Sequence, residues 1–146
     1  MTNHYPKLYE DTYGWAIHTA ELLRSNKMNE VNFDEVLEEI EALGRSEKHE
    51  LINRLVILIM HLLKWQYQST MRGHSWKYSI IEQRKQVKIH FKDNPSLKSK
   101  LDEILIDAYD VAVSKAIQQT GLEEKVFPTE CPYTFDQIID NDFFPY

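Results

Sequence analysis

The sequence predicts an all-α protein, and three observations support this prediction. Apolar residues recur at helical spacing through most of the 146 residues. Only four glycines and five prolines occur, which argues against an all-β or a disordered chain. An apolar content of 42% and a charged content of 27% are values of globular proteins. We therefore predict a single-domain helical bundle over residues 1–146, with about five main helices, a short C-terminal helix and an aromatic, proline-rich tail packed on it.

Two helices are expected after an N-terminal arm over residues 1–10. The first spans about residues 11–25, with Asp11 as its N-cap. The second begins at Asn32, which with Glu35 resembles a capping box, and it ends at Gly44. Helical spacing predicts the buried faces of the two helices. The first face comprises Tyr13, Ala16, Ile17, Ala20 and Leu23, and the second comprises Val36, Leu37, Ile40 and Leu43.

The most apolar segment, residues 47–68, predicts a central helix that is buried on nearly every side. Ser46 is the expected N-cap of this helix. The segment does not predict a membrane span, because Arg54, His61 and Lys64 interrupt it before the ~20 apolar residues that a span requires. The remaining helices are expected to pack around this segment.

Two further helices and a tail follow the central helix. Residues 75–93 predict a helix with a basic face, and its core positions at four-three spacing are Trp76, Ile80, Arg84, Val87 and Phe91. Asn94 and Pro95 begin the next helix, which Gly121 ends. In the tail, residues 122–146, Thr134 and Gln137 form a second candidate capping box for a short helix. The aromatic tail is expected to pack across the bundle, since its apolar surface would otherwise be exposed.

A line of polar side chains crosses the central helix. At 100° per residue, Glu47, Glu50, Arg54 and His61 fall on one side, and Lys64 continues the line. Glutamates on the flanks of the preceding helix are the expected partners across the interface. The predicted buried polar cluster thus comprises Glu39, Glu41, Glu47, Glu50, Arg54, His61 and Lys64. It is either a structural ion-pair network or a ligand or catalytic groove, and the sequence favours the structural interpretation.

Charge and composition limit the classes of partner and cofactor. The net charge is −6 and the isoelectric point is near 5.5, so we do not expect a nucleic-acid partner. The single cysteine, Cys131, excludes an intramolecular disulfide and any zinc site built on several cysteines. Di-metal helical bundles carry a Glu-x-x-His motif on two helices. This motif is absent from the sequence, so we expect no metal and no cofactor. The N-terminal residues show no apolar signal core, which predicts a cytoplasmic protein without a membrane partner.

Several segments resemble a known bacterial family. They are YEDTYGWAIHTAELLRSNK at 9–27, EEIEALGRSEKHEL at 38–51, RLVILIMHLLKWQYQ at 54–68, Ser75-Trp76, and FPTECPYTFDQIIDNDFFP at 127–145. Together they resemble the family catalogued as domain of unknown function 29, over nearly the whole chain. The resemblance implies a helical, cytoplasmic, bacterial protein, and it carries no established activity.

Two functions follow as hypotheses. The leading one is a non-enzymatic interaction or regulatory module that binds a protein partner, because the polar line carries no recognised catalytic signature. The alternative is an enzyme that acts on a phosphate-containing substrate such as RNA. In it, Arg54 would hold a phosphate and His61, seven residues later, would move a proton.

Overall fold

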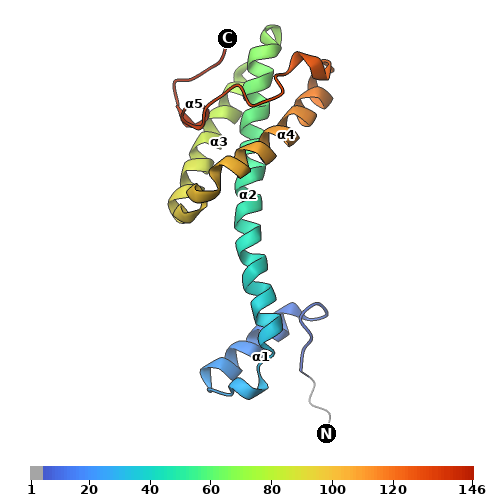
Figure 1. The fold of residues 1–146 in the computed structure, drawn as a ribbon, viewed down its shortest axis with the longest axis vertical. Helices are drawn as coiled ribbons and strands as arrows, with labels where there is room; N and C mark the ends of the chain where they lie inside the picture. Colours follow the sequence, from blue (N-terminus) through green and yellow to red (C-terminus); the bar gives the residue numbers. More distant parts are fainter. Residues whose placement is uncertain (1–4) are drawn as a thin grey trace. The chain divides into compact units, whose positions relative to one another are not determined.

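The computed structural model describes residues 5–146, and every regular element within them is a helix. The five α-helices are α1 (Thr12–Arg24), α2 (Phe33–Tyr67), α3 (His74–Asp93), α4 (Leu101–Thr120) and α5 (Phe135–Ile139) (Figure 1). Short 3₁₀ turns lie at Met28–Glu30, Ser69–Met71, Pro95–Lys100 and Glu124–Val126. The prediction of an all-α helical fold is confirmed. The first four residues of the predicted N-terminal arm lie outside the described residues.

The chain divides into two compact units, residues 1–44 and residues 45–146, which are described separately. In the first unit, the side chain of Asp11 caps α1 by accepting a hydrogen bond from the Gly14 amide at 2.9 Å. Leu8 and Val31 are buried beside α1, and the Tyr5 hydroxyl bonds to the Thr19 hydroxyl at 2.8 Å. The described residues of the arm are therefore docked.

The apolar faces predicted for the first unit are largely wrong. α1 buries Trp15, Thr19 and Leu22, while Tyr13 and Ile17 of the predicted stripe are exposed. The indole of Trp15 selects this face, because its N–H donates to Glu35 at 2.8 Å while its rings fill the core. On α2, the side chains of Leu37, Ile40 and Leu43 are exposed although their spacing predicted burial.

The predicted helix end at Gly44 is also wrong, because α2 continues through this residue. A glycine in a helix interior costs about 1 kcal/mol relative to alanine, which the good helix formers on both sides can offset. Ser46 therefore lies inside a helix and does not cap one. The division between the two compact units nonetheless falls directly after Gly44.

The second unit holds the large core. The C-terminal half of α2 contributes eight buried apolar residues between Leu51 and Leu63, and α3, α4 and the tail pack against them (Figure 1). Ile80, Val87 and Phe91 of α3 are buried, as their four-three spacing predicted. α4 follows the 3₁₀ turn that begins at Pro95. The helix is capped at its C-terminus by Gly121, whose φ is +73°.

A buried guanidinium fixes the tail to this core. Arg84 of α3 is fully buried, and its Nε donates to the Ile138 carbonyl at 2.8 Å. Its Nη2 donates to the carbonyls of Gln137 at 3.3 Å and Phe143 at 2.6 Å. The predicted capping box between Thr134 and Gln137 is present and begins α5, whose last carbonyls Arg84 satisfies.

Candidate functional site

Arg54 does not take part in a buried pair. Its Nη2 lies 3.2 Å from an oxygen of Glu50, one turn earlier on α2. The two side chains are 30% and 49% exposed, so solvent screens their attraction. Such a pair contributes about 0–1 kcal/mol to stability.

His61 makes its contact within its own helix. Its Nδ1 lies 2.8 Å from the carbonyl oxygen of Ile57, and because a carbonyl only accepts, this nitrogen carries the hydrogen. Burial lowers the pKa of His61 below its ordinary value of 6.5, the bond to Ile57 opposes this shift, and the charge of Lys64 adds to it. Among the described residues, no hydrogen bond joins His61 to Arg54. Each of the two side chains makes its hydrogen bond within α2, and a joint role for them in catalysis stays a prediction.

Lys64 is the one buried member of the predicted cluster. Its ammonium donates to the side-chain oxygen of Gln119 on α4 at 2.8 Å. The ammonium also lies 4.6 Å from the ring centroid of Trp76 on α3. Burial lowers the pKa of Lys64. These contacts connect α2, α3 and α4 of the second unit, and they support a structural role for Lys64.

The other predicted cluster members are not buried. Glu39 and Glu41 belong to the first unit, where Glu39 is half-buried and Glu41 is exposed. In the second unit, Glu47 is half-buried and Glu50 is exposed. The expectation of a buried cluster is thus corrected, because among these seven residues only Lys64 lies inside the core. A functional role for the polar line stays a prediction.

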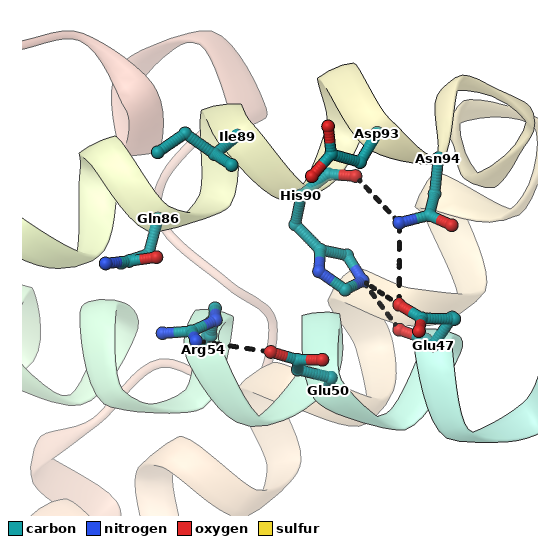
Figure 2. Close-up of a pocket in the computed structure, with 8 residues that line it drawn as sticks. All are labelled: Glu47, Glu50, Arg54, Gln86, Ile89, His90, Asp93 and Asn94. Atoms are coloured by element: carbon teal, nitrogen blue, oxygen red, sulfur yellow. Dashed lines mark hydrogen bonds and ion pairs between the residues drawn. The ribbon is translucent and has the colours of Figure 1, made fainter.

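Glu47 and Glu50, two residues of the polar line on α2, lie close to a residue that the sequence patterns do not indicate, His90 of α3. Glu47 and Glu50 of α2 and His90 of α3 line a pocket of about 340 Å³, and Arg54, Gln86, Ile89, Asp93 and Asn94 complete its walls (Figure 2). His90 lies 3.4 Å from a carboxylate oxygen of Glu47. One signal could have identified His90: it stands at helical spacing from the core residue Val87, so it lies at the edge of the buried face.

A second, larger hollow of about 1350 Å³ lies between α4 and the segment 123–131. Leu105, Val113 and Phe127 give it apolar walls, and Cys131 lies at one side. Burial raises the pKa of the Cys131 thiol, and the Sγ lies 3.5 Å from the Tyr133 carbonyl. The thiol is therefore protonated near neutral pH and is no activated nucleophile.

The first unit carries an exposed surface that we call the acidic apolar face. Its apolar part comprises Phe33, Leu37, Ile40 and Leu43 of α2, which are 53–65% exposed. At 100° per residue, Asp34 and Glu41 lie about 60° and 40° around the helix from Leu37, along one edge of the face. Large apolar side chains gathered on one side of an exposed helix are typical of an interaction surface.

Comparisons with known proteins identify a family and no individual relative. The family model described as domain of unknown function DUF29 matches residues 8–144. No curated protein and no solved structure matches the chain. None of the helices within residues 5–146 has the length and apolar composition needed to cross a membrane.

Proposed function

The chain belongs to the DUF29 family, and we propose that it is a non-enzymatic interaction module whose first unit binds a basic amphipathic helix of a partner protein. The acidic apolar face is the observation that carries this proposal. Four large apolar side chains on one side of a helix bind water poorly, and a partner helix would cover them.

In the first unit, exposed large apolar side chains outnumber buried ones, and this supports the proposal that a partner covers them. Within residues 5–44, the large apolar side chains that are buried are Leu8, Trp15, Leu22 and Val31. More than twice as many are exposed, namely Tyr9, Tyr13, Ile17, Leu23, Met28, Phe33, Leu37, Ile40 and Leu43. An unpartnered helix of a small folded unit is ordinarily apolar on its buried side and polar elsewhere. On α2, the residues whose helical spacing predicts a buried face form an exposed one.

Charge indicates which partner fits. Residues 28–44 contain six acidic residues and no lysine or arginine. A second copy of the chain would bring the same negative charges together, and an anionic lipid surface would repel them. A helix with lysines or arginines beside its apolar row would instead place its positive charges beside this negatively charged segment.

The geometry of such a complex follows from helix periodicity. The partner would present apolar residues at i, i+3 or i+4, and i+7, which matches the spacing of Phe33, Leu37 and Ile40. Its basic residues would lie along one edge, so that affinity falls as salt screens the exposed charges.

A designed peptide tests this proposal on the full chain. The probe is a helical peptide of leucine and lysine with one apolar row, measured by calorimetry against the wild type. The double variant Leu37→Ser/Ile40→Ser should bind at least about tenfold more weakly, which corresponds to about 1.4 kcal/mol. Val111→Ser, which removes an exposed aliphatic side chain from α4, should bind as the wild type does.

Two matched peptides and two further measurements decide between occupants of the acidic apolar face. A scrambled peptide of the same composition and a glutamate-for-lysine peptide should both bind weakly, since one lacks the apolar row and the other lacks the opposite charge. Equal binding of all three peptides would refute the proposal. Self-association that the double variant abolishes would assign the face to a second copy. Protection of residues 33–43 from hydrogen exchange in the free monomer, beyond that of other exposed helices, would show that the face is already covered.

A further inference from the structure

The pocket between α2 and α3 gathers three side chains of types that bind metal ions. Glu47, Glu50 and His90 each offer one ligand atom, and these atoms lie within 4.8 Å of one another. Figure 2 shows the imidazole reaching from α3 toward the two glutamates of α2. Carboxylate oxygens and an imidazole nitrogen at such separations can converge on one ion after small side-chain rotations.

One hydrogen bond fixes the ring of His90 and leaves its other nitrogen available as a ligand. His90 is 7% exposed, and its Nε2 donates to the backbone carbonyl of Glu47 at 2.8 Å. The neutral ring therefore has its lone pair on Nδ1, which makes no hydrogen bond in the part of the chain that the structure describes. In Figure 2 this second nitrogen points away from Glu47, toward the side of the pocket where Gln86 and Arg54 lie. Metal-ligating histidines almost always donate their other N–H to a carbonyl or a carboxylate, which fixes both ring and tautomer.

The glutamates keep capacity for a cation. Arg54 contacts Oε1 of Glu50, and Asn94 contacts Oε2 of Glu47 at 3.5 Å, so these contacts use one oxygen of each carboxylate. The pocket is lined by three carboxylates, those of Glu47, Glu50 and Asp93, and by one guanidinium. The lining thus has a formal charge of −2, which a divalent cation would neutralise.

We propose that Glu47, Glu50 and His90 bind a divalent transition-metal ion, with Zn²⁺ as the preferred class. One nitrogen and two oxygen ligands suit Zn²⁺ better than Mg²⁺ or Ca²⁺, which take oxygen ligands. Three protein ligands leave a position for water at an ion that favours four ligands. The ion would connect α2 with the C-terminal end of α3. The site is separate from the acidic apolar face, and neither proposal depends on the other.

A Zn²⁺ titration of the untagged, chelator-treated full chain tests the site by calorimetry. We expect one Zn²⁺ per chain, and Glu50→Gln should weaken binding about tenfold or more because it removes a charged ligand and keeps the size of the side chain. Glu50 is exposed, so this variant retains the fold even where His90→Gln does not. Bound Zn²⁺ should also raise the melting temperature of the wild type more than that of Glu50→Gln.

His49 provides the matched control, because it is an exposed histidine on α2 between the two glutamates in sequence. His49→Gln should bind Zn²⁺ as the wild type does, and excess Mg²⁺ should not compete. Absence of Zn²⁺ binding would overturn the proposal. So would equal affinity in the wild type and Glu50→Gln, or a loss of binding in His49→Gln, which would mark an adventitious surface site.

Discussion

The two compact units differ in what they bury and in the charge they carry. The second unit, residues 45–146, buries nineteen apolar residues in one core, whereas the first unit exposes more large apolar side chains than it buries. Charge is divided just as unevenly. Residues 1–44 contain nine acidic and three basic residues, and residues 45–146 contain fourteen of each. The net charge of −6 therefore resides entirely in the first unit.

We propose that this contrast reflects a division of roles between the two units. The second unit has a large buried core and balanced charge. Such a unit can be stable by itself, since burial of apolar surface supplies the dominant favourable term in folding. A unit of 44 residues with few buried side chains and a strong negative charge is suited to recognition. Three predictions test this contrast, from the largest expected effect to the smallest.

Arg84→Ala should lower the free energy of unfolding of the second unit by about 3 kcal/mol or more. The change leaves the carbonyls of Ile138 and Phe143 without their donor, removes one of the two donors to the Gln137 carbonyl, and creates a cavity in the core. Urea unfolding would measure it by tryptophan fluorescence in a Trp15→Phe background, in which both remaining tryptophans belong to the second unit. Lys85→Ala, at the exposed neighbouring position, should stay within about 0.5 kcal/mol of the background. A similar loss for both alanine variants would show that Arg84 does not anchor the tail.

Leucine-to-alanine changes at two positions of α2 compare the units directly. Leu58 is fully buried in the second unit, and Leu58→Ala should cost about 2–5 kcal/mol. Leu37 is 54% exposed in the first unit, and Leu37→Ala should cost less than about 0.5 kcal/mol. Both values come from urea unfolding of the full chain, with circular dichroism as the probe. A large loss for Leu37→Ala would mean that the face is covered in the monomer, which would remove the basis of the proposed function.

Acid should weaken the second unit through His61. Burial holds the pKa of His61 in the folded chain below 6.5, so the unfolded chain takes up the proton first as the pH falls. The contribution of the neutral ring is complete above the unfolded pKa, and it is lost as the pH falls through that value toward the folded pKa. The decrease in unfolding free energy from pH 7.5 to pH 5.5 should be smaller in His61→Gln than in the wild type, whereas exposed His49→Gln should reproduce the wild-type decrease. An unchanged pH dependence in His61→Gln would contradict the buried neutral ring.

Local signals predicted most of the fold. Asp11 caps α1, Thr134 and Gln137 form a capping box, and Gly121 adopts a left-handed conformation after α4. Each of these features depends on a few residues that are adjacent in sequence, so the sequence contains all the information needed. The end predicted at Gly44 was wrong because a glycine is only a weak helix breaker when helix formers flank it.

The candidate site was less predictable. The polar line on α2 predicts a role for Glu47 and Glu50, but it does not indicate His90, because this residue lies forty residues later and no periodicity connects it to them. Arg54 and His61 share a helix side, yet each satisfies its hydrogen bonds within one turn of its own helix. A shared side on a helical wheel therefore did not predict contact.

By itself, the sequence determined that this chain is helical, where its caps lie and which stretch is most apolar, because periodicity, turn residues and capping are local properties. Only the tertiary structure decided which apolar faces find a partner. It buried Arg84 under the tail and placed His90 beside Glu47, and it left Leu37 and Ile40 in water. The physical reason is that burial depends on surfaces contributed by residues distant in sequence, and a pattern along one helix does not specify what faces it.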